Sequence, residues 1–259
     1  MSGRKHTLVI LILLLLVVLT GLCISAFHLY RQENQMPEGE IPQMVWLYAK
    51  ANGLSYRDYP SQLIDLLERN PETKTFVLEY PFAKDATPVI DITPETQSDT
   101  VPLFLQWDQR WGYLRYGDDF AALTACGPVC LSMCGVYLTG NADFSPEKLI
   151  RFASENGYYV SGAGSSWTLI SQGGPQLGLQ VKEIPLVKNL ILQHLSAGTP
   201  IICAMGPGDF TTTGHFIVMT GVSDGMIQIN DPNSRSNSEK LWRYEDICDQ
   251  IRNLWTIAA

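Results

Sequence analysis

Basic residues are few in this sequence. Its 259 residues include 18 lysines and arginines and four histidines against 26 aspartates and glutamates, which gives a formal net charge of −8. Because Arg4, Lys5 and Arg31 lie near the N-terminus, the rest of the chain carries 15 basic residues against all 26 acidic ones, a net charge of −11. A surface of that sign argues against nucleic acid or anionic lipid as a partner.

Charged side chains are absent from Thr7 to Tyr30. At about 1.5 Å per residue, this stretch is long enough to cross a hydrocarbon layer of about 30 Å. It is longer than the apolar core of a signal peptide, and no small-residue cleavage site follows it. We therefore expect a single-pass transmembrane helix at 7–30 that anchors the chain in the cell membrane. Because Arg4 and Lys5 precede it, residues 1–6 should be a cytoplasmic tail and the rest extracytoplasmic.

Cysteine is too sparse for a disulfide framework in a domain of this size. Six are present, and Cys23 lies in the predicted membrane helix, so an odd number remains and at least one thiol is unpaired within the chain. Cys126, Cys130 and Cys134 recur every four residues and share one helix face. A metal site there would need a fourth ligand from elsewhere. Helix packing with one functional thiol is the favoured interpretation, with no metal.

No internal repeat is evident, and helices precede a meander of strands, which predicts an α+β fold. Residues 31–100 are interpreted as a membrane-proximal region and linker, and residues 101–259 as a domain rich in aromatics and glycines. The expected elements are helices at 41–53 and 61–70, an extended piece at 75–78, a linker at 83–100, an extended segment at 101–106, helices at 126–139, 146–156, 167–177 and 187–197, and strands at 201–204, 215–220 and 226–230.

Cys126 lies where a helix is expected to begin. Pro128 follows it, and proline is favoured in the first turn because its missing N–H would be unpaired there. The unpaired N–H groups and the positive end of the helix dipole favour a thiolate, the form of cysteine that attacks carbonyl carbon. A small apolar residue at a helix entry is the alternative interpretation.

A thiolate nucleophile needs a base, and imidazole is the usual one at neutral pH. His6 and His28 fall in the predicted tail and membrane span, and His194 lies within an expected helix. His215 begins a strand directly after a glycine-containing loop, a place where scaffolds often present functional side chains.

The strand after His215 forms a hairpin with the next one, since Asp224-Gly225 is a strong turn signal. A hairpin closed around 223–224 brings His215 opposite Pro232 and hence close to Asp231. A carboxylate there can accept a hydrogen bond from the imidazole and orient it. The alternative for Asp231 is a turn residue before proline.

The developing oxyanion needs a hydrogen-bond donor, and the amide of Gln106 offers one upstream of the cysteine. Its alternative is a solvated glutamine at a strand end.

Five segments in order resemble the C39-like peptidase domain, a papain-like cysteine protease fold found in many membrane-anchored or exported bacterial proteins. They are VPLFLQWDQRWG, ACGPVCLSM, ENGYYVSGAGSSW, AGTPIICAMGPGDFTTTGHFIVMTG and INDPNSRSN. The resemblance implies a helical part with the nucleophile helix and an antiparallel sheet that carries the histidine and aspartate. It implies Cys126 as nucleophile, His215 as general base and acid, Asp231 as orienting carboxylate and Gln106 as oxyanion donor. Ala125 departs from the pattern, since relatives commonly have glycine there.

The resemblance implies a thiol hydrolase that needs no metal or organic cofactor and acts on a peptide or protein substrate. No ATP-binding cassette or multi-span transporter is present, so the double-glycine specificity of transporter-fused C39 peptidases is not expected. The sequence predicts a membrane-anchored extracytoplasmic cysteine peptidase. The alternatives are a cell-wall peptide amidase or transpeptidase on the same fold, and a catalytically silent peptide-binding module.

Overall fold

The computed structural model describes residues 13–27, 30 and 35–259. The chain divides into two compact units, Met1–Arg69 and Asn70–Ala259. In the first unit, residues 13–27 are helical, and two helices follow, α2 (Glu40–Ala51) and α3 (Ser61–Arg69). A 3-10 turn, η1 (Tyr56–Asp58), lies between them with a capping box made by Ser55 and Asp58. Both α2 and α3 lie where the sequence predicts them.

No helix among the described residues is both long and apolar enough to cross a membrane. Residues 7–12 and 28–29 of the predicted transmembrane helix lie outside the described residues, as does the whole predicted tail, 1–6. Both remain predictions.

The second unit begins with the residues that directly follow α3. A 3-10 turn, η2 (Pro71–Thr73), leads straight into α4 (Lys74–Ala83), so the extended piece predicted at 75–78 is wrong. Phe76, Val77 and Leu78 are buried, and the ring of Phe76 stacks on Tyr113 at 4.3 Å. Burial of these side chains outweighs the weak local preference of Thr75 and Val77 for extended backbone. Residues 84–100 contain one short helix, α5 (Thr93–Thr96).

The segment 101–106 is not a strand, contrary to expectation. It is tied to the rest of the unit by isolated contacts. Asn230 Nδ2 donates to the carbonyls of Val101 and Pro102 at 3.0 and 3.1 Å, and Gln106 N–H donates to Pro232 O at 2.7 Å. Pro102 has no N–H to donate to a ladder, which disfavours regular pairing.

The helices at 126–139 and 146–155 agree with expectation. They are α7 (Cys126–Thr139), closed by Gly140 with a φ of 63°, and α8 (Pro146–Glu155). The segment predicted as one helix at 167–177 is a π-helical turn at Leu169–Gly173 followed by α9 (Gly174–Gln176). The remaining helical elements are α6 (Ala121–Thr124), η3 (Ala142–Phe144), α10 (Lys188–Ser196), α11 (Arg235–Ser238), α12 (Tyr244–Ile247) and η5 (Cys248–Gln250).

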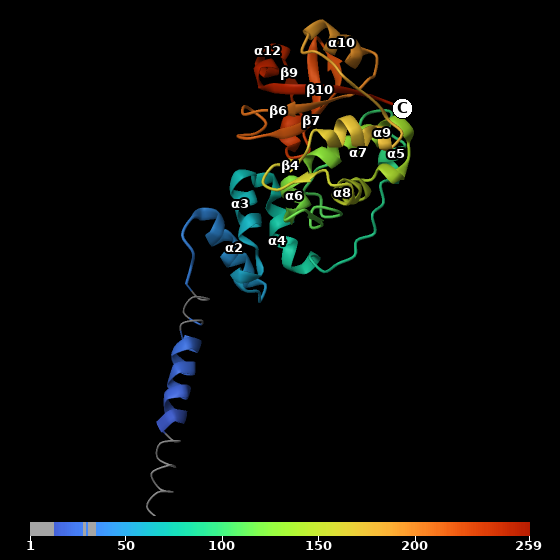
Figure 1. The fold of residues 1–259 in the computed structure, drawn as a ribbon. Coiled ribbons are helices and arrows are strands. Elements are labelled where there is room, and N and C mark those ends of the chain that lie inside the picture. Colours follow the sequence, from blue (N-terminus) through green and yellow to red (C-terminus); the bar gives the residue numbers. More distant parts are fainter. Residues whose placement is uncertain (1–12, 28–29, 31–34) are drawn as a thin grey trace, which may run out of the picture. The chain divides into compact units, whose positions relative to one another are not determined.

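An antiparallel sheet of six strands forms the C-terminal part of the second unit (Figure 1). Its order is β5 (Gln180–Glu183), β10 (Ile251–Ala258), β6 (Ile201–Met205), β7 (His215–Ser223), β8 (Met226–Asn230) and β9 (Leu241–Trp242). The strands β6, β7 and β8 match the predicted meander, whereas β5, β9 and β10 were not expected. Two smaller two-stranded sheets pair β1 (Arg115–Tyr116) with β2 (Asp119–Phe120) and β3 (Tyr159–Val160) with β4 (Gly164–Ser165).

Alternate residues of the central strands face two different cores. Ile202 of β6 and Val218 of β7 pack with the buried side of α7, while Ile201 and Met219 pack with Ile191 and its neighbours on α10. This period of two places α7 and α10 on opposite faces of the sheet. As a result, α7 is buried between the sheet and α8, and its first residue lies beside the end of the sheet where β7 begins.

Candidate active site

Cys126 is the first residue of α7 and is partly exposed, whereas every residue from Gly127 to Val136 is buried. A side chain at position 127 would lie 2.8 Å from Ser165, so glycine is required where this helix starts against β4. Burial raises the pKa of the Cys130 and Cys134 thiols well above their ordinary value. Of the three cysteines on this helix, only Cys126 is accessible for chemistry.

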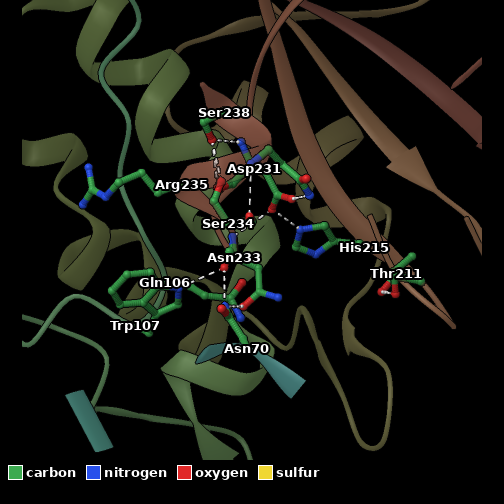
Figure 2. Close-up of polar contacts among 12 residues, drawn as sticks. Asn70, Gln106, Trp107, Thr211, His215, Asp231, Asn233, Ser234, Arg235 and Ser238 are labelled. Carbon is green, nitrogen blue, oxygen red and sulfur yellow. Dashed lines mark hydrogen bonds and ion pairs between the residues drawn. The ribbon is translucent and has the colours of Figure 1, made fainter. Parts of the chain in front are cut away.

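His215 and Asp231 lie together at the end of the sheet (Figure 2). His215 Nε2 lies 2.7 Å from Asp231 Oδ1. The His215 side chain is 8% exposed, and that of Asp231 is fully buried. The hairpin turn falls on Asp224 and Gly225, with φ values of 52° and 76°, one residue later than predicted. A bulge between Met219 and Gly221 shifts the register once more. Asp231, which follows β8, still reaches the imidazole.

The carboxylate of Asp231 is held by several donors besides the imidazole. Asn233 N–H donates to Oδ1 at 2.8 Å, and Asn237 Nδ2 donates to Oδ2 at 2.9 Å. The backbone N–H of Asp231 itself donates to Ser238 Oγ at 2.9 Å. A buried carboxylate with this many partners is fixed in position. The sequence analysis assigned no role to these supporting residues, although Asn233 and Asn237 lie in the run NDPNSRSN that carries the resemblance and Ser238 directly follows it.

Cys126 lies close enough to His215 to act on its titration, since the Cys126 side chain is one of the groups that raise the pKa of the imidazole. Since Nε2 faces Asp231, Nδ1 is the ring nitrogen left for the thiol. Burial lowers the pKa of His215, but the charge of Asp231, the hydrogen bond that its carboxylate accepts from the imidazole and the influence of Cys126 outweigh burial and raise the pKa above its ordinary value. The arrangement therefore favours an imidazolium beside the thiol at neutral pH.

Gln106 is buried, with 4% of its surface exposed, so it is not a solvated glutamine. Its Nε2 donates to Ala122 O at 2.7 Å, and its Oε1 is buried without a hydrogen-bond partner. A glutamine amide carries two N–H groups, so the bond to Ala122 uses one and leaves the second for another acceptor. Ala122 lies on α6, the short helix that precedes α7, and this bond ties Gln106 to that helix.

A tyrosine and a serine pack beside the start of α7. The hydroxyls of Tyr116 and Ser165 lie 2.8 Å apart, and burial raises the pKa of Tyr116. Neither residue was singled out from the sequence. The described residues contain no group of three or more His, Cys, Asp or Glu side chains suited to hold a metal ion.

Comparison with known proteins places this chain in a family. The family model described as "Peptidase_C39 like family" matches residues 98–259. No curated protein matches the chain.

Among solved structures, the peptidase domain of Streptococcus ComA, described as a bi-functional ABC transporter involved in a quorum-sensing pathway, is 17% identical, with a TM-score of 0.42 over 61% of this chain and 98% of that one. A putative C39-like peptidase from Bacillus anthracis is 13% identical, with a TM-score of 0.39 over 62% of this chain and 96% of that one. The resemblance found in the sequence is confirmed by the family match. The chain belongs to the Peptidase_C39 like family, which indicates a function of the cysteine-peptidase type.

Proposed function

We propose that this protein is a cysteine peptidase that hydrolyses peptide or amide bonds with Cys126, His215, Asp231 and Gln106. The observation that carries the proposal is the position of one buried imidazole close to both a helix-start thiol and a fully buried carboxylate. Membership of a peptidase family supports it. Nucleophile, base and orienting acid are the three parts that such a site requires.

In the proposed reaction, the Cys126 thiolate attacks the carbonyl carbon and forms a carbon–sulfur bond. The negative charge that develops on the carbonyl oxygen is bound by the second N–H of Gln106 Nε2 and by the backbone N–H of Cys126. The carbon–nitrogen bond then breaks, and the imidazolium of His215 gives its proton to the leaving amine. Water next attacks the thioester while His215 takes a proton from it, and cleavage of the carbon–sulfur bond releases the acid and restores the thiolate.

The raised pKa of His215 supports its role as the proton donor to the amine. An imidazole held protonated by Asp231 and Cys126 is ready to donate when the tetrahedral intermediate collapses. The fixed carboxylate of Asp231 keeps the ring oriented, so that Nδ1 stays directed at sulfur through both half-reactions.

The proposal places this peptidase outside the cytoplasm, anchored by the stretch Thr7–Tyr30. Its support is the absence of charge from that stretch and the presence of Arg4 and Lys5 before it. The substrates would then be extracytoplasmic peptides or proteins.

The pH dependence of iodoacetamide alkylation at Cys126 tests the site. A thiolate–imidazolium pair is expected to give fast alkylation near pH 6, where an ordinary thiol of pKa about 8.5 is almost wholly protonated. The variant His215→Ala should lose the fast reaction at that pH, and His194→Ala, on α10, should keep it. Slow alkylation in the unaltered protein, unchanged by His215→Ala, would reject the proposed pair and favour a binding module.

A further inference from the structure

The turn that supports Asp231 is itself held by a residue far away in the sequence. Glu72, in η2, accepts three hydrogen bonds with its carboxylate, all from residues 234–236. Its Oε2 accepts from Arg235 N–H at 2.8 Å, and its Oε1 accepts from Ser236 N–H at 3.2 Å and from Ser234 Oγ at 2.9 Å. Burial raises the pKa of Glu72, but these hydrogen bonds outweigh it and lower the pKa, which keeps the carboxylate ionised.

Asn70 holds the same loop at a second point. Its Nδ2 donates to Asn233 O at 2.6 Å, and its Oδ1 accepts from Glu72 N–H at 3.1 Å. Trp107 Nε1 donates to the same Asn233 carbonyl at 3.0 Å (Figure 2). Asn70 is 9% exposed, so this contact is largely shielded from water. Asn70 and Glu72 therefore hold residues 233–236, which comprise the end of the loop after β8 and the start of α11. We call Asn70 and Glu72 the clamp, and the segment 233–236 the Asp231 loop.

The clamped loop supplies donors and acceptors to Asp231. Asn233 N–H donates to the carboxylate of Asp231, and the carbonyl of the same Asn233 is the one that Asn70 binds. Ser234, bound by Glu72, also accepts from Asn237 N–H, and Asn237 Nδ2 donates to Asp231. Asn70 is thus linked to the carboxylate that orients His215 through two hydrogen bonds, and Glu72 through three.

We propose that Glu72 is a positioning residue of the peptidase site and that the functional unit begins at the clamp, before the family match at residue 98. The inference rests on the proposed function, because its consequence for turnover requires Cys126 and His215 to act as a pair. Glu72 acts only through the loop and Asp231. Displacing a reacting group by about 1 Å can cost roughly a hundredfold in rate, so a loosened loop should be visible in turnover.

Glu72→Gln is the sharpest variant because it preserves the size of the side chain. Its amide replaces one acceptor oxygen with an NH2 group. This group would face one of the donors on residues 234–236, and that donor would lose its hydrogen-bond acceptor. The matched control is Glu239→Gln, which makes the same change on an exposed glutamate directly after α11. Both variants are made in the full chain.

Two readouts separate positioning from a general loss of stability. The first is turnover of a peptide substrate, where Glu72→Gln should lower kcat between about tenfold and a hundredfold with little change in KM. The second is the NMR resonance of the His215 Nε2–H proton. In Glu72→Gln, the His215 titration midpoint should move to lower pH and the proton should broaden, because Asp231 is less firmly held. Glu239→Gln should match the unaltered protein in both.

The outcomes distinguish the clamp from the proposed function. A folded Glu72→Gln protein with unchanged kcat and an unchanged His215 resonance overturns the clamp. If the unaltered protein lacks turnover while Glu72→Gln still shifts the His215 resonance, the clamp stands and the peptidase assignment fails. Where Glu72→Gln does not fold, Asn70→Asp provides the test, because it keeps the acceptor for Glu72 N–H and replaces the donor to Asn233 O with a charged oxygen that repels this carbonyl. A folded Asn70→Asp protein with an unchanged His215 resonance and kcat would likewise overturn the proposal.

Discussion

The two sides of His215 are built differently. On the Asp231 side, the carboxylate is fully buried and accepts hydrogen bonds from Asn233 and Asn237 in addition to the imidazole. On the Cys126 side, the thiol is partly exposed at the start of a helix, and Gln106, which is bonded to Ala122 on the preceding helix α6, carries a buried oxygen without a partner. One side is saturated with protein contacts, and the other keeps unused hydrogen-bonding capacity.

This difference corresponds to two tasks. The acid must remain in place while the imidazole gains and loses a proton, and saturation with fixed donors achieves that. The thiol must meet a substrate that is absent in the resting protein, so its surroundings need free donors and access. Substitutions on the two sides should therefore fail in different ways.

Removing the thiol should have the largest effect. Cys126→Ala is expected to lower hydrolysis of labelled casein by at least about 10⁴-fold, since the variant lacks the thiol that forms the acyl intermediate. The control is Cys248→Ala, another partly exposed cysteine. Turnover of Cys126→Ala near the unaltered rate would show that the nucleophile is a different residue.

Removing the charge of Asp231 should come next. Asp231→Asn is expected to lower kcat by roughly 10³- to 10⁴-fold. Because the charge of Asp231 raises the pKa of His215, its loss should lower that pKa, and the alkaline limb of the pH–rate profile should move to lower pH.

The matched control is Asp224→Asn at the exposed hairpin turn, where asparagine tolerates the φ of 52°. An alkaline limb that stays in place in Asp231→Asn would mean that the carboxylate does not govern the imidazole.

Removing the Gln106 amide should cost less, because one backbone donor remains for the oxyanion. Gln106→Ala is expected to lower kcat roughly 10²-fold with a smaller change in KM. Steady-state kinetics on one peptide measures the changes in kcat and KM separately. The control is Gln193→Ala, which alters an exposed glutamine on α10. A rise in KM with kcat unchanged would instead assign Gln106 to substrate binding.

Substitution of Cys130 should have the smallest effect on activity of the variants considered. Cys130 lies one turn below Cys126 but is fully buried, so Cys130→Ala should leave kcat/KM unchanged. The small cavity should reduce the free energy of unfolding by about 1–2 kcal/mol, measured by urea denaturation. A large loss of activity without loss of stability would place Cys130 in the chemistry.

Prediction from the sequence worked best where a local signal specified an element. Pro128 and Gly140 mark the two ends of α7, and Asp224-Gly225 specifies the β7–β8 hairpin. It failed where partners distant in sequence decide the structure. The strand β10 pairs with β5 and β6, which lie more than 40 residues away. In α4, the ring of Phe76 stacks on Tyr113, a contact that favours the helix over the predicted extended piece.

The residues of the candidate site also fall into two groups, those indicated by the local sequence and those placed by distant contacts. The sequence alone indicated Cys126, His215, Asp231 and Gln106, because each is a reactive or polar residue at an expected element end, and the resemblance assigned their roles. It gave no indication of Glu72 and Asn70, since nothing in a polar turn between two helices reveals which loop it will bind. Those contacts join residues more than 160 positions apart.

The sequence by itself therefore determined the family, the nucleophile helix and the hairpin that brings His215 to Asp231. Local capping, turn geometry and side-chain periodicity act between neighbours, so they can be read in order along the chain. Only the tertiary structure decided the position of β10 between β5 and β6, the burial of Gln106 and the clamp on the Asp231 loop. These depend on hydrogen bonds and apolar burial between distant segments, whose pairing is set by the packing of the whole unit rather than by any one stretch.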